Sequence, residues 1–208
     1  MFLVFEGLDG TGKTSLAKEI VSRLNGRYLK TPPPEYENSR KKIHSTKNPY
    51  IRFLFYLSAN VFLSESIRKL PKDLILVCDR YFYTSIADFS YTSKMTAKDK
   101  DLIFWLKLMN RICIQPDIVF FCHCERDERK KRISNRNVTK VADDLSFQFE
   151  KAMLDTYKKI LPYETTFFLD TTIKTVNQLS EFIFSISSFR KKLGSFEFHE
   201  TRSLLTSL

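Results

Sequence analysis

Glycine is scarce in this chain, and long apolar runs are absent. Only five of the 208 residues are glycine, and three of those five lie within residues 7–12. No stretch approaches the roughly 20 apolar residues that a bilayer-spanning helix needs, so we expect no membrane segment. The chain opens on the strand-like "MFLVF" and lacks the basic region, apolar core and small-residue cleavage site of a secretory signal. We therefore expect a cytoplasmic location.

Cysteine and histidine are also few, with four and three residues respectively. Cys122 and Cys124 flank His123 in an apolar segment, where a metal site would need a second pair of ligands nearby. Only two other histidines exist. We therefore expect buried free thiols and no metal bound by these residues.

Basic residues outnumber acidic ones, 34 to 24, which gives a net charge of +10. A basic protein can neutralise the phosphates of nucleic acid, but no zinc-finger, RNP-like or basic-zipper pattern is present. The same charge can serve a small polyphosphate substrate. We therefore expect small-molecule partners and no nucleic-acid partner.

Strand and helix patterns alternate along a chain whose length fits a single domain, residues 1–208. Residues 2–5 are predicted to form a buried strand and residues 14–24 a helix with an apolar residue at every fourth position. Further strands are predicted in "RYLK", "LILVCDRY", "DIVFFCHC" and "TTFFLDTT". Residues 40–70 are predicted to be mostly helical, and residues 126–137 to form a basic helix that runs into a loop. Further helices are predicted at 101–114, after a polar stretch, and at 146–161 and 176–189. The alternation predicts an α/β fold with a parallel sheet covered by helices on both faces.

The segment "GLDGTGKT", residues 7–14, matches G-x-x-x-x-G-K-[ST], the phosphate-binding loop. Glycine lets successive backbone N–H groups converge on an anion, and the helix N-terminus behind the loop adds partial positive charge. The motif lies between a predicted strand and a predicted helix, which is the context that this mechanism needs. We therefore predict that ATP is bound by Gly7, Asp9, Gly10, Thr11, Gly12, Lys13, Thr14 and Ser15.

Lys13, Thr14 and Asp79 suit a magnesium–triphosphate complex. We expect the Lys13 ammonium to reach the β- and γ-phosphates and the Thr14 hydroxyl to bind Mg²⁺. Asp79 ends a buried strand at the sheet edge where α/β proteins bind ligands, so we predict that it holds Mg²⁺ directly or through water. A simple salt bridge to Arg80 is the alternative.

A basic segment follows the strand "DIVFFCHC". Arg129, Arg132 and Arg136 are spaced three and four residues apart and therefore share one face of a helix. They suit a lid, about residues 126–145, that brings positive charge to a transferring phosphate. A solvated helix face is the alternative. Residues from about 190 to 208 are expected to form a C-terminal tail that is either packed on the domain or mobile.

Taken together, these segments resemble the thymidylate kinase family of nucleoside monophosphate kinases. "FEGLDGTGKT" looks like the family's first strand and loop, "DRYFYTSIA" like its D-R-[YH] segment, and "PDIVFFCHCERDERKKRISNR" like its fourth strand and lid. "SAN" and "LDTT" follow the same order, and the resemblance covers about residues 2–185. It implies a P-loop NTPase fold with a five-stranded parallel sheet, the use of ATP and Mg²⁺, and a homodimer formed through helices, for which the apolar helix from residue 51 offers a surface.

The resemblance also implies roles for single residues. Asp9 would approach the sugar hydroxyl of the acceptor, and Arg80 would hold its phosphate. Some members carry a catalytic arginine where Gly10 stands here, and others take it from the lid, which implies catalytic roles for Arg132 and Arg136. Two positions depart from the family: Val61 replaces an arginine that contacts the base, and Asp88 replaces an aromatic residue.

The expected reaction is ATP-dependent phosphorylation of a nucleoside monophosphate, dTMP to dTDP. The two departures leave a UMP/CMP-type kinase of the same fold as an alternative, and the "TPPPE" turn looks like the mitochondrial UMP-CMP kinase branch. A deoxynucleoside kinase is a second alternative; its neutral acceptor hydroxyl would need a base, for which Glu35 is the candidate. A non-catalytic nucleotide- or nucleic-acid-binding module is a remote third.

Overall fold

The computed structural model describes residues 1–93, 99–135 and 146–194. Its five strands all run parallel, in the order β2–β3–β1–β4–β5. The predicted α/β class and parallel sheet are therefore confirmed. The strands are β1 (Phe2–Glu6), β2 (Arg27–Lys30), β3 (Leu76–Asp79), β4 (Ile118–His123) and β5 (Thr166–Asp170).

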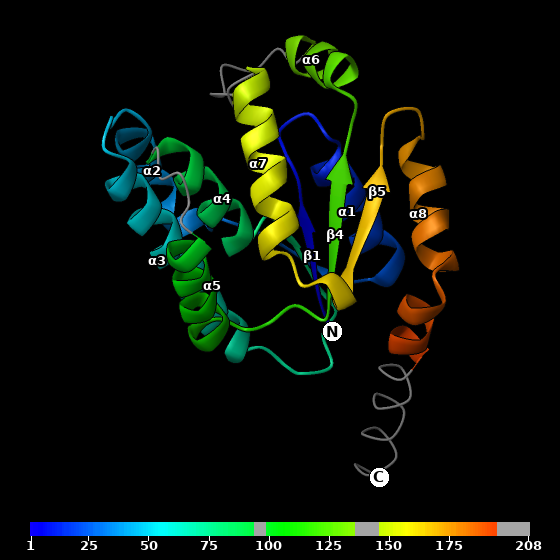
Figure 1. Ribbon diagram of the computed structural model, residues 1–208. Helices are drawn as coiled ribbons and strands as arrows, with labels where there is room; N and C mark the ends of the chain where they lie inside the picture. The colour runs from blue at the N-terminus through cyan, green and yellow to red at the C-terminus, as the bar shows by residue number, and fades with distance from the viewer. Residues whose placement is uncertain (94–98, 136–145, 195–208) are drawn as a thin grey trace.

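Helices connect the strands and cover both faces of the sheet (Figure 1). They are α1 (Lys13–Leu24), α2 (Glu37–His44), α3 (Pro49–Arg68), α4 (Phe82–Thr92), α5 (Asp99–Ile112), α6 (Arg126–Ser134), α7 (Phe147–Ile160) and α8 (Val176–Ser185). Two short 3₁₀ turns, η1 (Pro34–Tyr36) and η2 (Tyr163–Thr165), precede α2 and β5. None of the described helices has both the length and the apolar character that crossing a bilayer requires.

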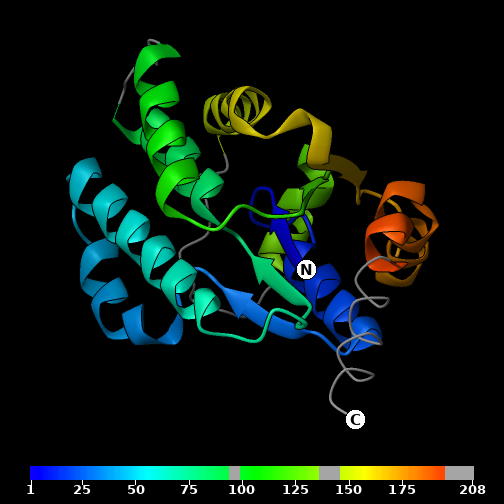
Figure 2. The same cartoon turned by 90° about the horizontal axis from the view of Figure 1, so that it is seen from below.

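Two hydrophobic cores lie on opposite faces of the sheet because successive side chains of a strand point to opposite sides. Leu3 and Phe5 of β1 pack with α1 and α8, whereas Phe2 and Val4 pack with α3, α4, α5 and α7. Figure 2 shows these two helical layers from below. Burial on both faces explains why β1, β3 and β4 are nearly continuous apolar runs. All four cysteines are buried as free thiols, as predicted.

One helix escapes the sequence analysis, which predicts none between Arg80 and residue 100. Helix α4 lies there, and its N-cap residue Tyr81 makes no capping bond with its own side chain. Instead, the Glu6 carboxylate at the end of β1 accepts hydrogen bonds from the N–H groups of Tyr81, at 2.9 Å, and Thr84, at 3.3 Å. A cap supplied from so far along the chain leaves no local sequence signal.

The helix predicted over 176–189 breaks at Ile186, and residues 187–194 are again helical. Phe189 is fully buried, with its ring centroid 5.9 Å from that of Phe120, and Lys192 Nζ donates to the carbonyl of Asp117 at 2.7 Å. The first residues of the expected tail therefore pack on the domain. Residues 195–208 lie outside the described residues.

Candidate active site

The loop between β1 and α1 needs glycine for space as well as for backbone conformation. Gly7 and Gly10 have φ angles of 136° and 87°, which L-residues with a side chain rarely adopt. A Cβ on Gly7 would lie 2.3 Å from the carbonyl oxygen of Cys122, and one on Gly10 would lie 2.9 Å from Cγ of Arg129. Helix α6 therefore occupies the space that an arginine at position 10 would need.

Lys13 begins α1 and is buried, with 4% of its surface exposed. Its Nζ donates to the carbonyl of Leu8 at 2.9 Å and lies 3.5 Å from Asp9 Oδ1. The ammonium group thus folds back across the loop, at the N-terminus of a helix whose free N–H groups favour anions. These are the groups that the loop motif predicts to bind phosphate, and that binding stays a prediction.

Thr14 and Asp79 meet beside the loop. Thr14 Oγ1 donates to Asp79 Oδ2 at 2.5 Å, and the Tyr28 hydroxyl donates to the same oxygen at 3.0 Å. Burial, and then the charge of Asp79, raise the pKa of Tyr28, so its hydroxyl remains a donor. Asp79 is 1% exposed, and its Oδ1 has no hydrogen-bond partner among the described residues.

An unpartnered buried carboxylate oxygen is costly unless something else binds it. A carboxylate and a hydroxyl are hard oxygen ligands, and Mg²⁺ typically takes one or two such protein ligands together with waters and substrate phosphates. Asp79 and Thr14 therefore fit a Mg²⁺ site. The 2.5 Å contact between them also brings both predicted metal ligands to one place.

Arg80 follows Asp79 directly and has a φ of 70°, a strained value for a residue other than glycine. Its Nη2 donates to Asp9 Oδ1 at 2.6 Å, and its Nη1 donates to Thr84 Oγ1 at 3.2 Å. Asp9 therefore lies between the cations Lys13 and Arg80. The structure thus brings together the two residues for which the family resemblance implies contact with the acceptor.

Glu6 is a buried carboxylate next to the site, and the sequence analysis missed it. It is fully buried and accepts hydrogen bonds from Tyr81 N, Thr84 N, Thr84 Oγ1 and the Tyr157 hydroxyl. Burial raises the pKa of Glu6, while the Thr84 hydroxyl and the charge of Arg80 act against that rise. The feature of the sequence that could have pointed to Glu6 is its position: it is a single acidic residue at the end of an apolar strand, just before the glycine loop.

Two of the lid arginines lie within the described residues. Arg129 is fully buried; its Nη1 donates to the carbonyl of Asp9 and its Nη2 to Glu150, both at 3.3 Å. The alternative of a solvated face is therefore wrong for Arg129. Arg132 donates to the carbonyls of Thr171, at 2.8 Å, and Thr172, at 3.0 Å. Arg136 and the rest of the predicted lid, residues 136–145, lie outside the described residues.

The segment after β5 also touches the phosphate loop. The Thr171 hydroxyl donates to the carbonyl of Thr11 at 2.8 Å. A Cβ on Gly12 would lie 3.8 Å from Nη1 of Arg132. Helix α6 therefore contacts both the loop and the chain that follows β5, and it lies above the end of β4 in Figure 1.

Polar side chains also line the contact between α3 and α4. Asn60 Nδ2 donates to Ser85 Oγ at 3.3 Å, and Arg52 forms a 3.1 Å ion pair with Asp88. Asp88, one of the two departures from the family, is therefore paired with a cation. Val61 is partly buried against the core on this side of the sheet. Glu35, the candidate base of the deoxynucleoside kinase alternative, lies exposed in η1.

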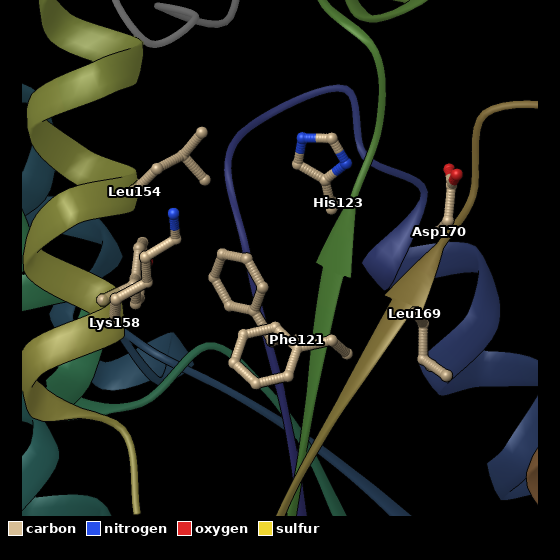
Figure 3. Close-up of a pocket in the computed structure, with 8 residues that line it drawn as sticks. Phe121, His123, Leu154, Lys158, Leu169 and Asp170 are labelled. Carbon is tan, nitrogen blue, oxygen red and sulfur yellow. The ribbon is translucent and has the colours of Figure 1, made fainter. Parts of the chain in front are cut away.

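A pocket of about 320 Å³ lies on the same side of the sheet, between α7 and the strands β4 and β5 (Figure 3). Its lining residues are Phe121, His123, Leu154, Tyr157, Lys158, Phe168, Leu169 and Asp170. Figure 3 shows His123 and Asp170 near the upper ends of their strands, with Leu154 and Lys158 reaching in from α7. The Tyr157 ring lines this pocket, while its hydroxyl reaches Glu6 and Thr84.

Comparison with known proteins gives consistent results. The family model described as "Thymidylate kinase" matches residues 5–183. A probable thymidylate kinase of Methanocaldococcus jannaschii is 29% identical over 184 residues, which cover 86% of this chain and 91% of the relative. The structure of thymidylate kinase from Candida albicans superposes with a TM-score of 0.70 at 22% identity and covers 91% of each chain. A deoxyadenosine kinase from M. mycoides superposes with a TM-score of 0.65 at 18% identity, over 88% of this chain and 97% of that one. At these identities, the two superpositions show the shared P-loop NTPase fold.

Proposed function

The chain belongs to the thymidylate kinase family, and from this membership we propose that it transfers the γ-phosphoryl group of ATP to dTMP and forms dTDP. The observation that carries the proposal is the meeting of three groups at one sheet edge. These are the phosphate loop with Lys13, the Thr14–Asp79 pair, and the Arg80–Asp9 pair. Relatives named thymidylate kinase supply the choice of acceptor.

On the donor side, the loop N–H groups and the Lys13 ammonium would hold the triphosphate. Thr14 and Asp79 would hold Mg²⁺, which when bound supplies positive charge to the phosphate oxygens. The loop residues, including Gly12 and Ser15, remain our assignment for ATP binding. Arg132 and Arg136 remain the proposed sources of charge from the lid, because helix α6 fills the space beside Gly10.

On the acceptor side, Arg80 would bind the monophosphate and Asp9 would approach the sugar. A phosphate monoester has its second pKa at about 6 and is therefore largely a dianion at neutral pH. It needs no general base. The protein must instead offset the repulsion between two anions, and the cations Lys13 and Arg80, on either side of Asp9, suit that task.

An ATP-coupled assay with the purified protein tests the proposal across dTMP, dUMP, UMP, CMP and dCMP, with thymidine and deoxycytidine as nucleoside controls. We expect the highest kcat/KM with dTMP. Activity on a nucleoside with none on any monophosphate would overturn the proposal in favour of a deoxynucleoside kinase. Salt-dependent nucleic-acid binding without ATP consumption would indicate a binding module.

We also propose that the protein is a cytoplasmic homodimer that pairs through α3. Ile51, Leu54 and Phe62 are 46%, 55% and 40% exposed, and their spacing of three and eight residues places them on one face of the helix. Exposed apolar residues that gather on one face are typical of an interface. Light scattering after size-exclusion chromatography should report a dimer, and Leu54→Glu should yield a monomer. A wild-type protein that is monomeric at assay concentration would contradict this.

A further inference from the structure

We propose that Glu6 and Thr84 are positioning residues for the acceptor, which hold the Arg80 guanidinium where the acceptor phosphate binds. The proposal rests on the function given above, in which Arg80 contacts that phosphate. Glu6 and Thr84 would touch neither substrate. They would act through a continuous chain of hydrogen bonds that joins β1, α4 and α7.

This chain of hydrogen bonds starts at Arg80, whose guanidinium donates through both of its terminal nitrogens. Nη2 donates to Asp9 at 2.6 Å and Nη1 donates to the Thr84 hydroxyl at 3.2 Å. Asp9 lies on the phosphate loop, whereas Thr84 lies in the first turn of α4. The two contacts therefore fix the guanidinium from two independent elements, which defines its direction better than one contact can.

The hydrogen bonds of the Thr84 hydroxyl make it an acceptor toward Arg80. A hydroxyl donates one hydrogen and accepts through two lone pairs. Thr84 Oγ1 donates to Glu6 Oε2 and accepts from Arg80. The Tyr157 hydroxyl, which donates to Glu6 Oε2, lies 2.8 Å from Thr84 Oγ1. Because its one hydrogen goes to Glu6 and a guanidinium can only donate, the Thr84 hydroxyl presents a lone pair to Arg80.

Glu6 is the acceptor at the other end of this chain of hydrogen bonds. Its partners from α4 and α7 are all donors, namely two backbone N–H groups and two hydroxyls. The backbone bonds also cap α4 and hold its first turn against β1. Because Arg80 stands directly before this turn with a strained φ of 70°, the same carboxylate stabilises the backbone from which the Arg80 side chain extends.

Thr84→Val tests the proposal, since it keeps the shape of the side chain and removes the hydroxyl. We expect the KM for dTMP to rise by about tenfold, as loss of a hydrogen bond to a charged group implies. The KM for ATP should change by less than about twofold, because Lys13 and the loop are untouched. Thr84→Ser should restore the dTMP value, since serine keeps the hydroxyl. Glu6→Gln, if it folds, should change the same parameter in the same direction.

Thr156→Val is the matched control. Thr156 is buried in α7 next to Tyr157. Among the residues that the structure describes, its hydroxyl bonds only within its own helix, to the carbonyl of Ala152 at 2.9 Å. It should leave the KM for dTMP unchanged. Equal rises in both KM values, or a fall in thermal stability without a change in the KM for dTMP, would overturn the positioning role.

Calorimetric titration of each variant with dTMP separates this proposal from the proposed function. If the wild type binds dTMP but does not phosphorylate it, the function fails while the affinities still test the positioning role. If the wild type phosphorylates dTMP and Thr84→Val binds it as tightly as the wild type, the positioning role fails and the function stands.

Discussion

The hydroxyl of Thr14 and the carboxylate of Asp79 lie 2.5 Å apart, although 65 residues separate them in the chain. Thr14 belongs to the first turn of α1 and Asp79 is the last residue of β3, the strand next to β1 in the sheet. The other carboxylate oxygen of Asp79 is buried without a hydrogen-bond partner among the described residues. The pair therefore has one carboxylate oxygen available for a cation.

Asp79→Asn should lower kcat by roughly 100-fold or more, the usual cost of removing one electrostatic contributor to the transition state. It should also raise the Mg²⁺ concentration needed for half-maximal rate. Tyr28→Phe is the control, since it removes the other donor to the same carboxylate and no cation ligand. Initial rates across a MgCl₂ series measure both effects. An unchanged Mg²⁺ requirement in Asp79→Asn would remove the metal role.

Lys13→Ala should abolish activity, because the ammonium lies against the loop at the N-terminus of α1 and no other side chain of the motif carries its charge. Lys18→Ala, on the exposed side of the same helix, should keep normal rates. Circular dichroism of both variants checks that each is folded. Turnover by Lys13→Ala within tenfold of the wild type would contradict the assignment.

Arg132→Ala and Arg136→Ala should each lower kcat by about tenfold or more with smaller changes in KM, because a contact made only in the transition state acts on kcat. Arg132 also holds the carbonyls of Thr171 and Thr172. If that were its whole role, the KM for ATP would rise and kcat would stay constant, and the lid role would be lost. Lys131→Ala, exposed on the same helix, is the control.

Gly10→Ala should destabilise the protein by about 1–2 kcal/mol from its left-handed backbone alone, and by more if α6 must move. The added Cβ would lie 2.9 Å from Cγ and 3.0 Å from the carbonyl oxygen of Arg129. A thermal-denaturation midpoint several degrees lower is expected. Gly194→Ala is the matched control, because nothing lies within 4 Å of its added Cβ. Equal midpoints for the two variants would show that α6 does not close over the loop.

Asp88→Ala should change the preference between dTMP and dCMP by about tenfold in kcat/KM, the range of one lost polar contact. Asp88 lies six residues beyond Phe82 along α4, about 9 Å at 1.5 Å per residue, which separates it from the Arg80 guanidinium proposed to bind the acceptor phosphate. Glu65→Ala breaks an exposed ion pair at the end of α3 and is the control. Equal preferences in the wild type and Asp88→Ala would place base choice elsewhere.

The donor half of the site could be read from the sequence because its determinants are contiguous. Gly7, Gly10 and Gly12 share one loop, and Lys13 and Thr14 follow directly in the helix that it caps. The apolar runs of β1, β3 and β4 likewise predicted these strands, since strands buried on both faces leave continuous apolar runs.

Helix α4 and the role of Glu6 could not be predicted from the sequence. The carboxylate that caps this helix lies at the end of β1, and the helix begins 76 positions later, at Phe82. Likewise, spacing alone placed Arg129 and Arg132 on one helix face. It could not show that Arg129 is buried against Glu150 while Arg132 binds the chain after β5. Which neighbour a long, flexible side chain meets depends on the elements packed around it.

The sequence by itself therefore determined the fold class, the phosphate loop and the residue types that face a triphosphate, because local backbone conformation and periodic burial need only near neighbours. Only the tertiary structure decided which distant side chains meet at the sheet edge: Thr14 with Asp79, Arg80 with Asp9, and Glu6 with Thr84. Those contacts depend on the order of strands in the sheet, and that order is fixed by packing of the whole core.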